Sequence, residues 1–499
     1  MRRSYRVHRR VASHTSPEQV DRRRFLSFAA TGLLGLYGGR LTAREISRFP
    51  VVGPTRAAQR VLIVGAGVSG LAAARTLADA GHDVVVIEAR DRIGGRIATS
   101  SHWADAPVDL GASWIHGVDN NPIAQLADAI GAQTVVTDND ASATFGVNGA
   151  PLNAAEQFRL QQLQGEIDDS VQAGQGAATD LALFETITTG IGYEQLSPSD
   201  QRFADFLMNE IELSFAGSLQ DLSTYWFDDG DFFGGAEVVF PSGYRVITDH
   251  LATGLAIELG QTVLQVAASS SGVTVTTDKG TFTGDRAVVT LPLGVLQAGT
   301  VQFSPALPSS MQQAVDGLAM GVLNKAYLRF PTVFWPNDLD WLAQIPQVYG
   351  QWTNWLNINR VVAQPILMGF NAADFGQVIE AWSDEDIVAA GMEHLRTIFG
   401  TGIPDPVDFQ ITRWASDPYT WGSYSFMPTG SHPAMRDALA GNVENRIFFA
   451  GEATSRQYAS TVHGAYLSGL AAAEKVASAD SVFADGFESG DFSAWAVVG

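Results

Sequence analysis

Val61-Leu62-Ile63-Val64-Gly65-Ala66-Gly67-Val68-Ser69-Gly70 is the stretch that decides the fold of this chain. Its first four residues are apolar and mostly β-branched, which predicts a buried strand of a parallel sheet. The glycines Gly65, Gly67 and Gly70 come directly after this strand, and residues 71–78 then predict a helix. Small residues at such a turn let the backbone approach a pyrophosphate at the N-terminus of the helix. The three glycines are therefore expected to bind a dinucleotide cofactor.

A second strand is expected at Val84–Ile87, and it ends on Glu88. A carboxylate in this position accepts hydrogen bonds from ribose hydroxyls in dinucleotide-binding folds. Gly94-Gly95-Arg96 follows shortly afterwards, where a plain dehydrogenase begins another helix. A long ligand that lies over this second turn explains the glycine pair better, which favours FAD over NAD. Arg96 could pair with a surface acid, but the preceding glycines favour a phosphate contact.

Further blocks along the chain carry a resemblance to a known family. The segment around Gly94 resembles glutathione-reductase-like FAD proteins, and residues 109–117, Asp-Leu-Gly-Ala-Ser-Trp-Ile-His-Gly, are similar to the flavin-facing loop of polyamine oxidases. Together the blocks identify the chain as a member of the flavin amine oxidase family, similar to polyamine and spermine oxidases and related to lysine-specific histone demethylases. The other matching blocks are residues 240–244, 288–296, 303–308, 321–330, 421–425, 449–455 and 460–469.

This resemblance implies an α/β fold, in which a glutathione-reductase-like, FAD-binding Rossmann domain is interleaved with an α+β substrate domain. The alternating stretch 272–277 predicts part of a second sheet in the FAD-binding half. The helical pattern of residues 154–220 predicts a lid over the substrate. The FAD-binding domain would combine residues 58–130, 235–310 and 430–478, and the substrate domain would combine residues 131–234 and 311–429.

Lys325 is one of only three lysines in the chain. It stands among apolar residues of an expected strand, where alternation would direct its side chain inward. A buried ammonium is costly unless a partner or a task justifies it. The alternative is a strand lysine that points to solvent. By resemblance, Lys325 holds a water near N5 of the flavin and assists hydride transfer or reoxidation by oxygen.

The resemblance assigns further residues to the cofactor. Glu452 would contact the ribityl or pyrophosphate region, although helix capping before the following Thr-Ser pair is the alternative. The backbone of Val263 would meet the adenine, unless Val263 is a plain core residue. The blocks that would face the flavin also contain Gly111, Ala112 and Val462.

Four residues are assigned to catalysis or to the substrate by resemblance. Tyr424 would form one aromatic wall beside the flavin, where a ring face stabilises a cation. The second wall is commonly a tyrosine, but the matching residue here is Thr461, a departure that resembles demethylases and spermine oxidases more than monoamine oxidases. His116 is either structural or keeps the amine neutral, because an imidazole exchanges a proton near neutral pH. Glu212 would anchor a distal ammonium, or is a solvated helix acid.

The composition excludes several kinds of site. The chain has no cysteine, so disulfides, thiolate metal ligands and a flavin link through cysteine sulfur are excluded. The histidines show no metal-ligand spacing, so no metal is expected. The net charge of −22 should repel nucleic acid and draw a small cationic substrate toward a cleft, although it also fits a plain solvated surface. No apolar run reaches the roughly 20 residues that span a membrane.

Both ends extend beyond the matching blocks. Residues 1–57 contain Arg22-Arg23-Arg24-Phe25-Leu26 and then the short apolar stretch 28–36, which resembles a twin-arginine export signal with a linker. A periplasmic or extracellular protein is therefore expected, with cleavage between residues 38 and 58. Residues 479–499 resemble short tails of exported bacterial proteins and are assigned no chemistry.

The resemblance implies an oxidase with non-covalent FAD that converts an amine, expected to be a polyamine, and O2 to an imine or aldehyde, an amine and H2O2. A monoamine oxidase, a flavin desaturase and an L-amino-acid oxidase of the same fold are the alternatives. A non-catalytic flavin-binding module is an alternative from another class. An amino-acid oxidase would need an arginine for the substrate carboxylate, and the candidates are Arg159, Arg202, Arg329, Arg360, Arg396 and Arg413.

Overall fold

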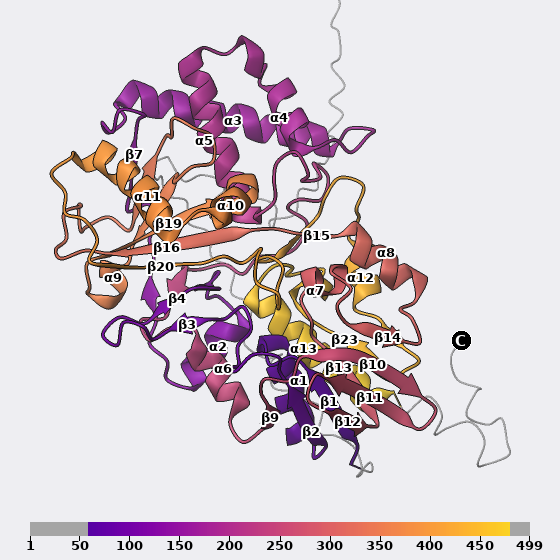
Figure 1. Cartoon of the computed structure of the whole chain (residues 1–499). Coiled ribbons are helices and arrows are strands. Elements are labelled where there is room, and N and C mark those ends of the chain that lie inside the picture. The colour runs from indigo at the N-terminus through magenta and orange to yellow at the C-terminus, as the bar shows by residue number, and fades with distance from the viewer. Residues whose placement is uncertain (1–57, 480–499) are drawn as a thin grey trace, which may run out of the picture.

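The structure is a computed structural model that describes residues 58–479. The expected export signal lies outside the described residues, and so does the expected tail from residue 480 onward. Two halves are visible, one built around a parallel sheet and the other around a mainly antiparallel sheet (Figure 1). Several segments of the chain contribute to each half, so the chain crosses between them repeatedly.

The first sheet contains the strand predicted from the opening stretch. Residues 61–64 are at most 1% exposed, because helices or loops cover both faces of this strand. The two strands predicted before and after the glycine turn pair in parallel. The edge strand β22 runs antiparallel to its neighbour. In spatial order the sheet consists of β22 (Asn442–Val443), β23 (Ile447–Phe449), β13 (Arg286–Val289), β1 (Arg60–Val64), β2 (Asp83–Ile87) and β9 (Ala256–Glu258).

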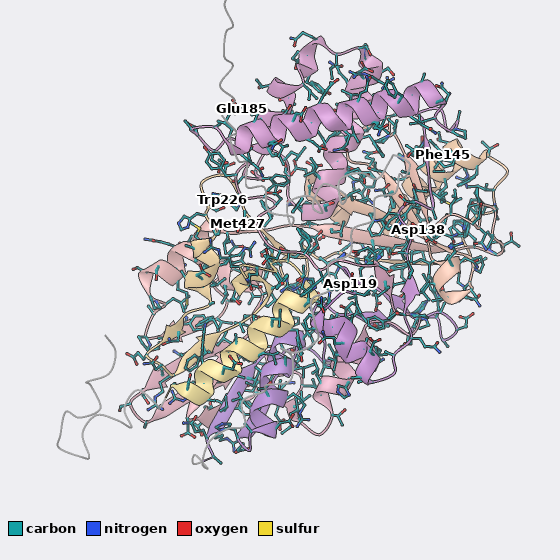
Figure 2. The ribbon with its side chains drawn as sticks, turned by 180° about the vertical axis from the view of Figure 1, so that it is seen from behind. Asp119, Asp138, Phe145, Glu185, Trp226 and Met427 are labelled. Atoms are coloured by element: carbon teal, nitrogen blue, oxygen red, sulfur yellow. The ribbon has the colours of Figure 1, made fainter. Side chains whose placement is uncertain are left out.

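Helix α1 (Val68–Asp79) begins inside the glycine turn, three residues before the predicted start. It packs against α13 (Val462–Ser478), the last helix, and the rear view shows α13 in yellow alongside it (Figure 2). Gly469 permits this contact, because a Cβ there would lie 2.2 Å from the Ser69 carbonyl oxygen. The first and last helices of the described chain therefore share one face of the parallel sheet.

A second sheet in the same half confirms the prediction made from residues 272–277. Most of its pairs are antiparallel, and β10 pairs in parallel with β14. One face of this sheet packs on the same apolar core as β1 and β13. In spatial order it consists of β12 (Thr281–Gly284), β11 (Gly272–Thr277), β10 (Val263–Ser269) and β14 (Gln302–Ser304).

The other half is built on a six-stranded sheet that is antiparallel except between β17 and β7. The strand that carries Lys325 does not show alternating burial, because residues 324–328 are all buried. Core side chains cover both faces of this strand, so its lysine is enclosed whichever face it uses. In spatial order the sheet consists of β20 (Asp408–Ile411), β16 (Leu323–Arg329), β19 (Ile366–Ala372), β18 (Asn354–Asn357), β17 (Trp341–Gln344) and β7 (Ser142–Phe145).

Helices cover the outer side of this half (Figure 1). The predicted helical stretch 154–220 forms α3 (Ala154–Gln175), α4 (Leu183–Gly190) and α5 (Pro198–Phe215). A capping box begins α3, in which the Asn153 and Glu156 side chains each bond the backbone N–H of the other. The remaining helices are α2 (Pro122–Ala129), α6 (Arg245–Ala252), α7 (Leu293–Gln297), α8 (Ser309–Gly317), α9 (Asn359–Val362), α10 (Ala373–Val378), α11 (Asp384–Phe399) and α12 (Ala434–Leu439).

Three small sheets hold the loops between the two halves. In the three-stranded sheet, the middle strand pairs with residues 114–115 on one side and with residues 135–136 on the other, so both ends of the segment 114–136 are held. Within residues 58–479, no helix combines the length and apolar character needed to cross a membrane. The small sheets are β5 (Trp114–Ile115), β8 (Val238–Val239) and β6 (Val135–Val136), then β3 (Thr99–Ser100) with β4 (Val108–Asp109), and β15 (Ala319–Met320) with β21 (Ser425–Phe426).

Candidate functional site

A cavity of about 1100 Å³ connects the glycine turn to Lys325. Its walls come from both halves of the molecule, and it exceeds the roughly 300–1,000 Å³ that is usual for a small-molecule site. Most residues assigned to the cofactor or substrate line it, whereas Gly70 and Glu212 do not. Those that do are Gly65, Gly67, Glu88, Arg96, Gly111, Ala112, His116, Val263, Lys325, Tyr424, Glu452, Thr461 and Val462.

The glycine turn forms part of the cavity wall. A Cβ at Gly70 would lie 2.0 Å from the Gly65 carbonyl oxygen, so this position requires glycine even though it does not face the cavity. No side chain caps the N-terminus of α1, where Gly67 and Val68 line the cavity. The carboxylate of Glu88 accepts hydrogen bonds from the backbone N–H groups of Ala66 at 2.7 Å and Arg90 at 2.9 Å. The uncapped helix end offers N–H groups and a positive dipole to an anion.

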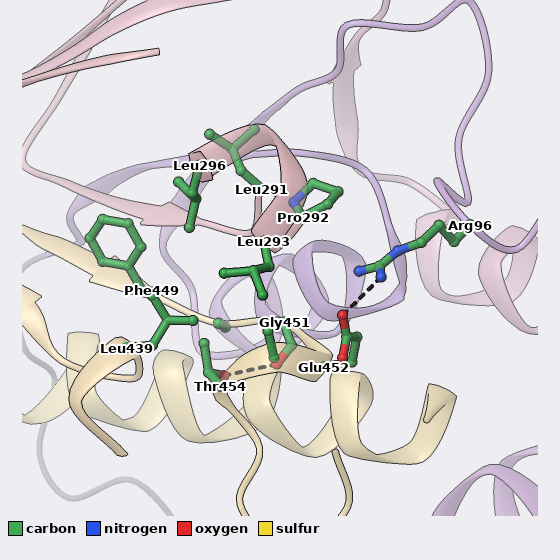
Figure 3. A pocket seen from close by; sticks show the side chains of 12 residues that line it. Arg96, Leu291, Pro292, Leu293, Leu296, Leu439, Phe449, Gly451, Glu452 and Thr454 are labelled. Carbon is green, nitrogen blue, oxygen red and sulfur yellow. Dashed lines mark hydrogen bonds and ion pairs between the residues drawn. The ribbon is translucent and has the colours of Figure 1, made fainter. Parts of the chain in front are cut away.

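Arg96 and Glu452 form an ion pair on the wall of this cavity, in which Glu452 is buried and Arg96 is half-buried. Nη1 of Arg96 donates to Oε1 of Glu452 at 2.8 Å, and Figure 3 shows the guanidinium directed at this carboxylate. Behind them lies a small cavity of about 10 Å³ lined mainly by apolar side chains. Glu452 caps no helix, because the N-cap residue of its short 3-10 helix is Gly451 and that of α13 is Thr461. Arg96 therefore pairs with a buried acid rather than a surface one.

A second arginine extends this ion pair. Arg436 is 3% exposed and donates to the Ser425 hydroxyl at 2.8 Å, which in turn donates to Glu452 at 2.7 Å. Burial acts to raise the pKa of Glu452, but the charges of Arg96 and Arg436 lower it overall. Glu452 is thus held ionised between two cations on the cavity wall.

Lys325 also lines the cavity and is 5% exposed. Its Nζ donates to the carbonyl oxygens of Asp109 at 3.1 Å and Gly111 at 2.5 Å, and to the Ser113 hydroxyl at 2.6 Å. The ammonium also lies 5.6 Å from the ring centre of Trp114, within cation–π range. Burial lowers the pKa of Lys325, and the Asp109 carboxylate partly opposes this effect.

The Asp109 carboxylate is a buried neighbour that the sequence reasoning did not single out. It accepts hydrogen bonds from the Thr99 hydroxyl and from the Tyr244 backbone N–H. Burial raises the pKa of Asp109, against the effect of these bonds and of the Lys325 charge. Since Asp109 also supplies a carbonyl oxygen to Lys325, one residue both orients the ammonium and contributes to its electrostatic surroundings.

His116 and Tyr424 both line the cavity but have different surroundings. The imidazole Nδ1 of His116 lies 2.7 Å from a carboxylate oxygen of Glu237, which also lines the cavity. The hydroxyl of Tyr424 donates to the carbonyl oxygens of Leu213 at 3.2 Å and Ser214 at 3.3 Å, and burial raises its pKa. The Tyr424 ring is therefore tied to the end of α5.

Thr461, which matches the second aromatic wall, is the N-cap residue of α13. Its hydroxyl accepts from the Gly464 N–H at 2.9 Å and donates to the Tyr458 carbonyl oxygen at 2.8 Å. Tyr458 also lines the cavity and stacks on Phe233 with ring centres 4.8 Å apart. The family match pointed to Thr461, whereas the aromatic ring at the cavity belongs to Tyr458, three residues earlier in the sequence.

The structure does not bring Glu212 to the cavity. Its carboxylate accepts from the Leu219 N–H and from the Asn209 amide, both at 3.1 Å, on another face of α5. Glu210 lines the cavity instead and is 4% exposed. Its carboxylate accepts from the Asn354 amide at 2.8 Å, and burial raises its pKa to about 7. Two acids stand two positions apart on one helix, and the sequence does not say which of them faces inward.

The residues of the cavity fit a bound flavin dinucleotide. A Cβ at Gly65 or Gly70 would clash with Thr290 or with the Gly65 carbonyl oxygen, so the tight turn requires glycine at both positions. Gly67 lines the cavity, and a Cβ there would have no protein atom nearer than 4.0 Å, so only its backbone now borders that space. Glu88, the uncapped N-terminus of α1 and Arg96 provide acceptors, N–H donors and a cation along one wall. The rest of the cavity, toward Lys325, is bordered by aromatic residues such as Trp341 and Phe370.

Comparison with known proteins gives a consistent result. Residues 68–477 match the family described as flavin containing amine oxidoreductase. Polyamine oxidase 4 of Oryza sativa subsp. japonica is 34% identical over 436 residues, which cover 83% of this chain and 88% of that protein. Polyamine oxidase 2 of Arabidopsis thaliana is also 34% identical, over 83% of this chain and 87% of its own length.

A relative of a different kind matches the same part of the chain. Lysine-specific histone demethylase 1 homolog 2 of Arabidopsis thaliana is 35% identical over 435 residues. The match covers 83% of this chain but only 58% of that protein.

Proposed function

Because the chain belongs to the flavin-containing amine oxidoreductase family, we propose that it is an FAD-dependent oxidase of polyamines. The observation that carries this proposal is the single cavity that joins the glycine turn, Lys325 and Glu210. Glu210 is a buried carboxylate that forms no ion pair with a lysine or arginine in the part of the chain that the structure describes. A buried acid of this kind favours a ligand that brings a positive charge of its own.

The overall reaction converts an amine, O2 and water to an aldehyde, a shortened amine and H2O2. When bound, the flavin supplies the redox chemistry, which is hydride acceptance from the carbon next to the amine nitrogen and electron transfer to oxygen. We propose that the FAD is non-covalent and lies in a glutathione-reductase-like domain made of residues 58–130, 235–310 and 430–478. Residues 131–234 and 311–429 would form the substrate domain.

The side chains of the cavity have separate tasks in this proposal. Glu210 binds a distal ammonium, while the walls formed by Trp341, Phe370 and Tyr424 exclude water from the reacting carbon. Lys325 uses all three of its N–H donors on the loop 109–113. To orient a water toward the cofactor, the ammonium must first break one of these three hydrogen bonds. A short movement of the loop 109–113 would break it.

The amino-acid oxidase alternative receives no support from the arginines. None of the six candidate arginines of the substrate half lines the cavity. The arginines that do line it are Arg90, Arg96 and Arg436, which bond Asp417, Glu452 and Ser425 respectively. All three belong to the segments proposed for the FAD-binding domain, and each already bonds a protein partner.

A substrate panel tests the proposal. Peroxide release is measured from the purified flavoprotein with spermine, spermidine, putrescine, a monoamine and L-amino acids. We expect the polyamines to react with the highest kcat/KM, and turnover of amino acids alone would overturn the proposal.

Glu210→Gln should lower kcat/KM for spermidine at least roughly tenfold, because the substrate ammonium loses its buried charged partner. The same variant should affect a monoamine far less, and an equal loss for both substrates would assign Glu210 a structural role.

A further inference from the structure

One row across the six-stranded sheet carries three residues of the cavity wall. Lys325 on β16 lies opposite Phe370 on β19. Trp355 on β18 lies opposite Gly369, so the same antiparallel register places Asn354 beside Phe370. Residues opposite each other on neighbouring strands project to the same face of a sheet, and all three residues of the row line the cavity. Because neighbouring strands lie about 4.8 Å apart, the backbones of Lys325 and Asn354 are separated by about 10 Å.

Helix α5 places Glu210 against the Asn354 end of this row. The amide of Asn354 donates from Nδ2 to Oε1 of Glu210 at 2.8 Å. The preceding residue of each element makes a similar contact, because the Thr353 hydroxyl donates to Oδ1 of Asn209. Two consecutive residues at the beginning of β18 thus hold two consecutive residues of α5. The pair formed by Glu210 and Asn354 is therefore fixed by the packing of a helix on a strand.

Two oxygen atoms of this pair are available to a ligand. Within residues 58–479, Oε2 of Glu210 and Oδ1 of Asn354 accept no hydrogen bond. Glu210 is 4% exposed and Asn354 is 6% exposed, and both line the cavity. Burial raises the pKa of Glu210 to about 7, although the bond from Asn354 acts against this rise. A buried carboxylate beside a neutral acceptor favours a ligand group that has a positive charge and several N–H donors.

Aromatic rings border the cavity between this pair and Lys325. The ring centre of Trp341 lies 6.0 Å from that of Phe370 and 5.9 Å from that of Trp114. All three rings line the cavity. Apolar rings of this kind favour contact with methylene groups, because both surfaces are then removed from water. The wall therefore suits an aliphatic chain whose charged end lies at Glu210 and Asn354.

We propose that Glu210 and Asn354 together bind a free terminal ammonium of the polyamine, and that Asn354 is a substrate-binding residue. This inference rests on the proposed function and adds the chemical form of the distal end of the substrate. The ammonium donates one N–H to Oε2 of Glu210 and another to Oδ1 of Asn354, and its charge compensates the buried carboxylate. An N-acetylated end carries no charge and a single N–H, so it can satisfy only one of the two acceptors.

Spermine and diacetylspermine, which is acetylated at both ends, test this inference because they share one chain and differ in terminal charge. Peroxide release from the purified holoenzyme gives kcat/KM for each. We expect kcat/KM to be at least roughly tenfold lower for diacetylspermine, because the buried carboxylate then lacks a cation. Equal values for the two compounds would overturn the inference and leave the proposed oxidation of polyamines intact.

Binding without turnover separates the inference from the proposed function. Calorimetry is performed with both compounds on the holoenzyme, after its flavin has been reduced under nitrogen. We expect spermine to bind more tightly than diacetylspermine. If neither compound is oxidised but spermine binds more tightly, the ammonium site stands and the proposed function fails. If neither is oxidised and both bind equally, the ammonium site fails as well.

A variant at Asn354 gives the third test. Asn354→Ser removes the amide oxygen and should raise KM for spermine roughly tenfold or more, the usual weight of a hydrogen bond to a charged group. KM for diacetylspermine should change far less. Asn357→Ser changes another buried asparagine of β18, one that does not line the cavity, and should leave the ratio of the two KM values unchanged. An equal rise for both compounds in Asn354→Ser would show a structural role and contradict the inference. If Asn354→Ser fails to fold, Asn354→Gln, which displaces the amide by one methylene, is measured in the same way.

Discussion

At the scale of single residues, Lys325 shows what the sequence could and could not predict. Its scarcity and apolar neighbours predicted a buried ammonium, and the structure confirms the burial. Its partners were out of reach of that reasoning, because they lie more than 200 residues earlier in the chain, in the loop 109–113. Long-range pairing depends on sheet packing, which no local pattern encodes. The same reason hid Asp109 and Glu237, whose neighbours come from distant strands.

Lys325→Met provides a test at this scale. The variant should slow turnover by roughly 100-fold, the lower range for a group that moves or orients protons. The flavin should stay bound, because Lys325 contacts the loop 109–113 rather than the glycine turn. Stopped-flow reduction and reoxidation, with the visible absorbance of the purified protein, measure both effects. Lys279→Met, at an exposed lysine, serves as the control. Loss of the flavin from Lys325→Met would show that the ammonium is structural instead.

At the scale of elements, the strands and helices next to the glycine turn form within a few residues of their predicted bounds. Helix α5 shows the limit of such reasoning. Its sequence predicted an acid near the site. Residues 203–212 of this helix are almost all buried, so no polar face distinguishes the side that faces the cavity. Whether Glu210 or Glu212 faces the cavity is decided by how α5 packs against β18, whose Asn354 side chain donates to Glu210.

Glu212→Gln tests the electrostatics of α5. Burial raises the pKa of Glu212 from 4.5 to about 7 in the folded protein. The native state therefore binds this proton more tightly than the unfolded state does. The contribution of Glu212 to stability is full below about pH 4.5, and it is lost as the pH rises toward 7. Thermal unfolding from pH 5 to 8 should show a shallower loss of stability in Glu212→Gln than in the native protein. Parallel curves would contradict the burial argument, and Glu185→Gln, on the neighbouring helix α4, is the control.

At the scale of the whole molecule, the composition predicted an acidic protein and the blocks of sequence predicted an interleaved chain. The strands of the parallel sheet all come from residues 60–87, 256–289 and 442–449, and those of the larger antiparallel sheet come from other segments. The single cavity between them could not be read from any one block, because its walls combine residues from at least five separate parts of the chain.

The net charge of −22 gives a prediction at this scale. A strongly negative molecule attracts a polycation at long range, and dissolved salt screens this attraction. We expect kcat/KM for spermine to fall steeply with added KCl, with kcat nearly constant. A singly charged amine should show a shallower slope in the same experiment. If kcat/KM falls equally with KCl for the two substrates, the negative charge of the protein does not draw the polyamine to the cavity.

The contact between α1 and α13 has a consequence for any shortened form of the protein. Gly67 and Val68 at one helix, and Thr461 and Val462 at the other, line the same cavity although they are far apart in the sequence. A fragment that lacks either helix therefore lacks one wall of the cavity, and we expect such a fragment to lose the flavin.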